Sequence, residues 1–150
     1  MIIWLASYPK SGNTYVRAFL SAYYFSENGE FDFSQISNID QFPHEKFFKR
    51  KVNSISEASK QWVPIQKEIN KDKKIRFFKT HSFLGSYQNS EFTSPETTLA
   101  AVYIVRDPRT VFTSIQPHSS FTDDNPLNMI TVNTRILMQH TVSHAYLPVI

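Results

Sequence analysis

The sequence predicts an α/β fold with a mostly parallel sheet flanked by helices. Three short apolar runs, rich in β-branched and aromatic residues, are predicted to be buried strands: 2–6 (IIWLA), 75–79 (IRFFK) and 99–105 (LAAVYIV). Segments with helical periodicity or helix-start signals follow the first and third runs, and another precedes the second. Strands that alternate with helices favour a parallel sheet, which binds ligands at the carboxyl ends of its strands.

The composition indicates one compact domain over residues 1–150. A chain of 150 residues with 41% apolar and 15% aromatic content can bury an adequate core. Its 16 basic and 13 acidic residues give a net charge of +3, which favours anionic partners without indicating nucleic acid. The absence of cysteine excludes disulfides, thiol nucleophiles and cysteine zinc sites. Without a basic leader or a run of roughly 20 apolar residues, we expect a cytoplasmic protein with no membrane association.

The first predicted strand is followed by a loop and a helix. The strand at 2–6 ends before Ser7-Tyr8-Pro9, and a helix is expected from Thr14 to a stop at Asn28-Gly29. Its apolar residues at helical spacing are Val16, Phe19, Leu20, Tyr23 and Tyr24.

The middle of the chain is less regular. Residues 31–53 carry Pro43, scattered aromatic residues and a basic cluster, so we expect a mobile or partner-dependent region with short helical pieces. Apolar residues spaced three and four apart predict a helix over 55–69 with Ser56 as its N-cap. Pro64 should kink this helix.

The second half is expected to add two strands and two helices. A polar stretch rich in serine and threonine separates the strands at 75–79 and 99–105. A helix should begin at Pro108, because the fixed φ of proline suits a first turn, and its inner face should hold Val111, Phe112 and Ile115. The segment 127–146 is predicted to be a last helix.

The loop after the first strand has the composition of a phosphate site. Lys10 supplies a positive charge, Gly12 lets the backbone approach a ligand, and Ser11 and Thr14 offer hydroxyl donors. Backbone N–H groups and the helix dipole also favour an anion there. The order differs from the Walker pattern, because Lys10 precedes its glycine. The simpler alternative is a strand-to-helix turn capped by Thr14.

Two other strand ends carry polar groups that suit the same chemistry. His81 follows Lys79-Thr80 at the end of a predicted strand, where a histidine can act as a general base, although an isolated histidine there is more often structural. Arg106 offers a bidentate fork to phosphate, and Ser114 lies eight residues further along the following helix. Asp107 is expected to cap that helix, and Arg109 to be a surface or ion-pair residue.

These motifs together resemble the sulfotransferases that use 3′-phosphoadenosine 5′-phosphosulfate (PAPS). The run YPKSGNTY resembles the family's YPKSGxTW loop, KTH matches its KTH motif, and the arginine and serine have the family's spacing. The resemblance implies that the loop from Lys10 to Thr14 wraps the 5′-phosphosulfate, and that Tyr15 replaces the tryptophan stacked on adenine. The donor-binding residues it implies are Lys10, Ser11, Gly12, Asn13, Thr14, Tyr15, Arg106 and Ser114.

The resemblance also implies a reaction. The sulfuryl group of PAPS would pass to a small-molecule hydroxyl acceptor by in-line attack, with His81 as base and with Lys10 and Lys79 contacting the transferring group. No metal is expected, because cationic side chains neutralise the charge. The implied fold is a P-loop-like, minimal or truncated sulfotransferase fold, since no glycine follows Gly85 to form the family's GxxGxxK element. The apolar run 145–150 suggests a surface that a homodimer would cover.

Two other functions remain open at the level of sequence. A nucleotide kinase or NTPase would use the same loop, with Asp107 near magnesium, and a non-catalytic nucleotide-binding relic would bind without turnover. His140 and His144 have a spacing that can bind zinc, but they lack the glutamate of HExxH and a third ligand, so no metal site is predicted.

Overall fold

The computed structural model describes residues 1–115 and confirms the predicted fold class. Its main sheet has four parallel strands in the order β2-β3-β1-β6. These strands are β1 (Ile2–Ser7), β2 (Asp40–Gln41), β3 (Arg76–Thr80) and β6 (Thr98–Ile104). The helix predicted over 127–146, the His140 and His144 pair and the apolar run 145–150 lie outside the described residues.

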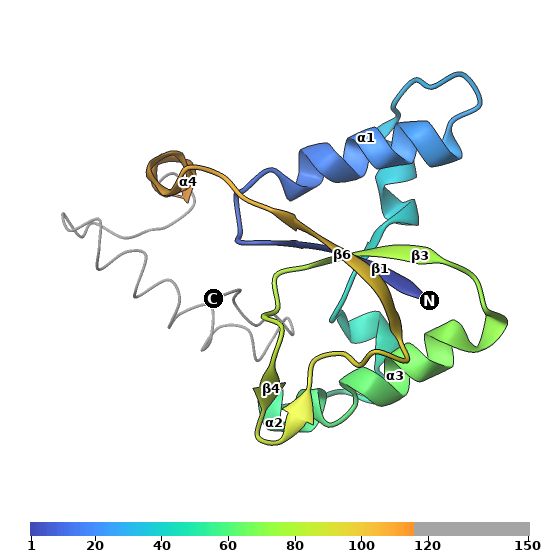
Figure 1. Cartoon of the computed structure of the whole chain (residues 1–150), viewed down its shortest axis with the longest axis vertical. Helices are drawn as coiled ribbons and strands as arrows, with labels where there is room; N and C mark the ends of the chain where they lie inside the picture. The colour runs from blue at the N-terminus through green and yellow to red at the C-terminus, as the bar shows by residue number, and fades with distance from the viewer. Residues whose placement is uncertain (116–150) are drawn as a thin grey trace.

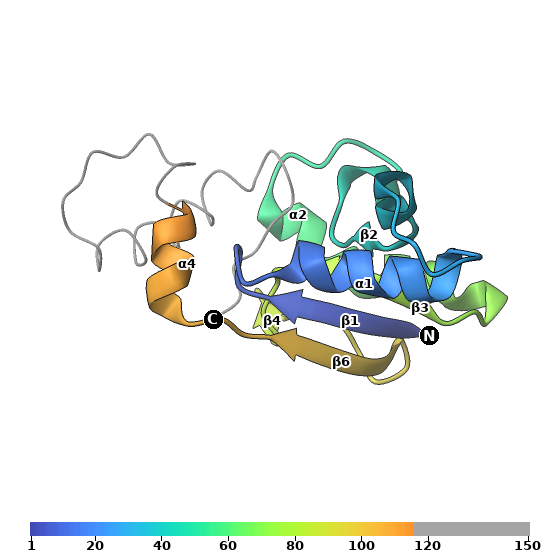
Figure 2. The same ribbon diagram turned by 90° about the horizontal axis from the view of Figure 1, so that it is seen from above.

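Helices lie on both faces of the sheet. The helix α1 (Asn13–Phe25) covers one face, and α2 (Ile55–Ser59) and α3 (Trp62–Ile69) lie on the other (Figure 1). The helix α4 (Pro108–Ile115) lies beyond the carboxyl end of β6 (Figure 2). The remaining elements are the 3-10 turns η1 (Phe33–Asn38), η2 (Glu45–Phe47) and η3 (Asn70–Asp72), and a hairpin of β4 (Ser86–Tyr87) and β5 (Ser90–Glu91).

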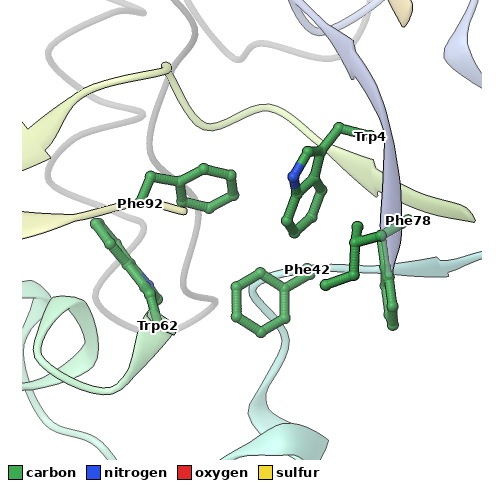
Figure 3. Close-up of a cluster of buried hydrophobic side chains, with 6 residues drawn as sticks. Trp4, Phe42, Trp62, Phe78 and Phe92 are labelled. Carbon is green, nitrogen blue, oxygen red and sulfur yellow. The ribbon is translucent and has the colours of Figure 1, made fainter. Parts of the chain in front are cut away.

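An aromatic cluster fills the space between the sheet and α3. Its labelled members, which converge in Figure 3, are Trp4, Phe42, Trp62, Phe78 and Phe92. Trp4 and Phe78 are register partners in β1 and β3, so both point to this face. Leu5 and Lys79, the next pair, therefore point to the face that α1 covers. The aromatic cluster supports one side of the sheet, and Lys79 lies on the other side.

We predict that Phe42→Ala lowers the free energy of unfolding by about 3–5 kcal/mol. Phe42 is fully buried, and its ring centroid lies 5.8 Å from that of Trp4, so truncation leaves a cavity in the cluster. Leu84→Ala is the matched control, because Leu84 is 88% exposed and should change the free energy by less than about 0.5 kcal/mol. Urea unfolding measures both, and equal effects would contradict the packing described.

The helix expected over 55–69 is divided into two, and the expected kink at Pro64 is wrong. The break falls between α2 and α3, and Pro64 lies in the first turn of α3, where its missing N–H has no intrahelical acceptor to lose. Ser56 is not the N-cap: the Oγ of Ser54 accepts a hydrogen bond from Glu57 N at 3.2 Å.

The region 31–53, expected to be mobile or partner-dependent with short helical pieces, does contain the short helices η1 and η2, and it is organised against the sheet. Gln41 of β2 is the register partner of Lys79 in β3, which adds a strand that the sequence did not predict. The Nη2 atom of Arg17 in α1 donates to the carbonyls of Ile36 and Ile39 at 3.0 and 2.6 Å. These bonds connect η1 to α1 and position β2 at the edge of β3.

The sequence predicts that residues 99–105 form a buried strand. They do form a strand, β6, but most of its residues are exposed. Within residues 1–115, β6 pairs with β1 on one side only. Val102 and Tyr103 are 47% and 55% exposed. An apolar run specifies a strand, but neighbouring elements decide how much of it is covered. No helix in the described part of the chain is long and apolar enough to span a membrane, and the cytoplasmic location stays a prediction.

Candidate active site

The predicted polar motifs meet at the carboxyl edge of the sheet. His81, after β3, places its Nδ1 atom 2.6 Å from the carbonyl oxygen of Ser7 at the end of β1. Arg106, after β6, donates from Nη1 to the carbonyl oxygen of Lys10 at 3.1 Å. Two segments that are distant in sequence therefore contact the end of β1 and the loop between β1 and α1.

The loop between β1 and α1 holds two residues in the left-handed region. Ser11 N donates to Tyr8 O at 3.2 Å, which closes a turn with Pro9 and Lys10 at its centre. Lys10 has φ 67° and Gly12 has φ 102°. A left-handed conformation costs a lysine about 1–2 kcal/mol, and such strain is concentrated at functional sites.

The amino end of α1 faces this loop without a side-chain cap. Gly12 is the N-cap residue, so Thr14 does not cap the helix as the simpler alternative requires. The first N–H groups of a helix have no intrahelical acceptor and attract anions. A Cβ built on Gly12 meets no atom within 4 Å, so the space above this position is open. The loop and the helix end therefore fit a phosphate or sulfate group.

The side chains of the loop face different ways. Lys10, Thr14 and Tyr15 are exposed, and the ring of Tyr15, at 78% exposure, is available for stacking. Ser11 and Asn13 are 7% and 5% exposed. The Asn13 amide points inward, where Nδ2 donates to Leu5 O and to Ser7 Oγ. Only the backbone N–H of Asn13 therefore remains to donate to a bound ligand.

A small hollow continues from the loop toward β6. Its volume is about 170 Å³, and its polar lining includes Tyr8, Ser11 and Arg106. Arg106 is exposed and borders this hollow, where its guanidinium is accessible to an anion. Ser114 is half-buried on α4 and does not line the hollow.

His81 is held as a neutral imidazole. Burial lowers the pKa of His81 to about 4, the nearby charge of Lys79 and a smaller contribution from Arg17 act in the same direction, and the hydrogen bond to Ser7 opposes them. A carbonyl oxygen can only accept a hydrogen bond, so Nδ1 of His81 is protonated and donates to Ser7 O. In a neutral imidazole the other nitrogen, Nε2, then carries a lone pair that can accept a proton.

Lys79 lies on the same face and shares this environment. Burial and, to a smaller extent, the charge of Arg17 together lower the pKa of Lys79 to about 8. Its Nζ donates to Gln41 Oε1 at 3.1 Å. Lys79 is therefore mostly a cation at neutral pH, close enough to His81 to affect its pKa.

Asp107 and Arg109 have the roles expected for them. Asp107 Oδ1 accepts from Arg109 N at 2.9 Å at the start of α4, and its carboxylate pairs with the Arg109 guanidinium at 2.6 Å. Both oxygens of Asp107 are thus engaged within the chain. Among residues 1–115, no group of three or more His, Cys, Asp or Glu side chains is arranged to hold a metal ion.

The structure adds three residues that sequence reasoning did not identify. Ser7 contacts His81, Arg17 shifts the pKa of both His81 and Lys79, and Gln41 contacts Lys79. Only Arg17 could have been identified from the sequence, because it lies among the apolar residues of α1 and a buried charge needs partners. Nothing in the sequence marks Ser7 or Gln41 as site residues, because many strands end in an ordinary polar residue.

Comparison with protein families agrees with this geometry. Residues 2–144 match the family described as "Sulfotransferase domain". No curated protein and no solved structure matches the chain. The match covers the loop between β1 and α1, the histidine after β3 and the arginine after β6, and it supports sulfotransferase activity in general. The chain therefore belongs to the sulfotransferase domain family.

Proposed function

We propose that this protein transfers the sulfuryl group of PAPS to the hydroxyl group of a small molecule by in-line attack. The observation that carries the proposal is the neutral His81 imidazole, which is hydrogen-bonded through Nδ1 to Ser7, where the anion-binding loop begins. A base beside an anion site suits a reaction in which a hydroxyl loses a proton while a charged group is transferred.

The loop has the features that a bisphosphorylated donor needs. PAPS, when bound, supplies a sulfuryl group attached to a phosphate leaving group. The exposed Lys10 and the uncapped amino end of α1 offer charge and N–H donors to that end of the molecule. Arg106, hydrogen-bonded to the Lys10 carbonyl, borders the adjoining hollow and would receive the 3′-phosphate. Ser114 of α4 is the second residue proposed for this phosphate, although it does not line the hollow.

Each basic group has a separate role in the proposed reaction. His81 Nε2 accepts the proton of the acceptor hydroxyl as that oxygen attacks sulfur. Lys10 and Lys79 stabilise the negative charge that grows on the leaving oxygen. A bound anion also favours the protonated imidazole and so raises the pKa of His81 when the base is needed. No covalent intermediate with the protein is required.

The competing functions receive less support from the site. A magnesium-dependent kinase would need Asp107 to release Arg109 and the α4 backbone before it reached a metal. A relic that binds without turnover would not need a neutral histidine at the loop. The homodimer expected from the sequence stays a prediction, because its apolar segment lies outside the described residues.

The direct test is to incubate the protein with PAPS and a panel of phenols, alcohols, sugars and lipid alcohols, and to measure release of 3′-phosphoadenosine 5′-phosphate. We expect acceptor-dependent release without added magnesium. Lys67→Ala should behave like the wild type, because Lys67 is an exposed residue of α3 on the other face. Turnover of ATP with magnesium would support the kinase, and binding of the bisphosphate without transfer would support the relic.

We expect kcat/KM to have limits set by the two shifted groups. His81 must be neutral and its pKa is about 4, so activity should persist below pH 6 and fall only as pH approaches 4. Lys79 must be charged and its pKa is about 8, so activity should fall as pH rises through 8. Lys79→Arg should move the alkaline limit upward. An acid limit near the ordinary histidine value of about 6.5 would contradict the environment described for His81.

A further inference from the structure

Two buried residues connect His81, the proposed base, to the loop between β1 and α1, which we call the donor loop because it is proposed to bind PAPS. Asn13, the first residue of α1, donates from Nδ2 to the carbonyl of Leu5 at 2.8 Å and to the Oγ of Ser7 at 3.1 Å. Ser7 is fully buried, and its Oγ lies 3.3 Å from His81 Nδ1. A continuous line of contacts therefore runs from Asn13 through Ser7 to His81.

The chemistry of the partners determines how the Asn13 amide is oriented. Leu5 O can only accept a hydrogen bond, so it must face the amide nitrogen and not the amide oxygen. Both hydrogens of Nδ2 are then used, one on Leu5 O and one on Ser7 Oγ. The Oδ1 atom is buried and has no partner in the described structure. The amide is thus held by its donor side, although a buried acceptor without a partner is costly.

Ser7 acts on the histidine through two atoms. Its carbonyl accepts the proton of Nδ1, which selects the tautomer with a lone pair on Nε2. Its Oγ, which accepts a hydrogen bond from Asn13, also lies 3.3 Å from His81 Nδ1 and so limits rotation of the ring. Removing the Asn13 amide would free the Ser7 hydroxyl to turn away, and the ring would lose its contact with Ser7 Oγ.

We propose that Asn13 and Ser7 are positioning residues that hold the His81 imidazole beneath the donor loop with Nε2 as its proton acceptor. This inference rests on the proposed function, because it assigns the base its orientation. Asn13 directly follows Gly12 in the donor loop, so the segment proposed to bind PAPS also holds His81 in place. The imidazole stays neutral in this environment, which the low pKa of His81 supports.

The test compares two pairs of variants by nitrogen NMR of the labelled histidines at neutral pH. Asn13→Ala and Ser7→Ala interrupt the contacts, and His81→Gln identifies the His81 signals. Asn70→Ala is the control for Asn13→Ala, because Asn70 makes a similar bond to Thr97 O at 2.9 Å on the other face. Ser21→Ala is the control for Ser7→Ala, because Ser21 is a fully buried serine elsewhere on α1.

In the wild type we expect a protonated Nδ1 and an unprotonated Nε2. Asn13→Ala and Ser7→Ala should shift or broaden the His81 signals and lower kcat about tenfold, since misplacing a base slows transfer more than binding. Ser7→Thr keeps the hydroxyl and should restore both readouts. The two controls should leave the His81 signals unchanged, even if thermal unfolding shows that they lose as much stability.

The outcomes separate this inference from the proposed function. A proton on Nε2 in the wild type would overturn the inference, as would His81 signals that respond equally to Asn13→Ala and Asn70→Ala. Transfer by the wild type with an unchanged kcat in Asn13→Ala and Ser7→Ala would also overturn it and leave the proposed function intact. The expected NMR changes without transfer by any variant would uphold the contacts and reject the sulfotransfer reaction. If Asn13→Ala does not fold, Ser7→Ala decides the question.

Discussion

The His81→Gln protein is expected to lose about 100- to 10,000-fold of its kcat for sulfuryl transfer, the usual contribution of a general base. Glutamine has a similar length and can still accept and donate hydrogen bonds, but it cannot take a proton. Binding of 3′-phosphoadenosine 5′-phosphate should be nearly unchanged, because the loop that receives it does not depend on the imidazole. Single-turnover kinetics and calorimetric titration measure the two quantities separately.

His44→Gln provides the control for this substitution. His44 is half-buried and accepts a hydrogen bond from Lys46 N at 3.3 Å at the start of η2. Its replacement should leave kcat at the wild-type value. Substantial turnover by His81→Gln would reject His81 as the base, and a large loss of bisphosphate affinity would indicate that the imidazole helps to bind the donor.

The second large effect concerns Lys10, whose replacement by alanine should lower kcat about 100- to 1,000-fold, as loss of one charge-stabilising group typically does. Lys10 is the exposed cation of the loop, beside the amino end of α1, where the departing phosphate would lie. Lys10→Arg keeps the charge and should retain more activity than Lys10→Ala. Similar kcat values for both variants would show that the charge is not used.

The backbone of Lys10 allows its chemical role to be separated from its structural one. Lys10→Gly should be as inactive as Lys10→Ala, yet raise the free energy of unfolding by about 1 kcal/mol, because glycine adopts φ 67° without strain. Lys73→Gly is the control, since Lys73 has φ 60° at the end of η3, far from the loop. It should gain similar stability and keep full activity. A loss of stability in Lys10→Gly would contradict the strain described.

Elements with strong local patterns were predictable from the sequence. The apolar runs located β1, β3 and β6, and Pro108 marked the start of α4. The placement of His81 and Arg106 at neighbouring strand ends followed from the parallel sheet, because carboxyl ends of parallel strands share one edge. These predictions depended on local periodicity and on one rule of topology.

Features that depend on tertiary contacts were not predictable. Asp40 and Gln41 are polar, and they form a strand only because β3 offers an open edge beside the η1 segment held by Arg17. Asn13 looked like a donor-binding residue, and nothing in its neighbourhood showed that its side chain would turn inward to Leu5 and Ser7. The division between α2 and α3 likewise has no clear marker in the residues themselves.

The order of the strands has a consequence for how the protein folds. β1 pairs with β3 and β6, so its partners lie some 74 to 97 residues away along the chain, from Ile2 with Arg76 to Ile3 with Ala100. Bringing such distant segments together closes large loops before any contact stabilises them, which slows folding. The bonds between His81 and Ser7 and between Arg106 and Lys10 span the same distances. The active site therefore forms only after segments that are distant along the chain have come together.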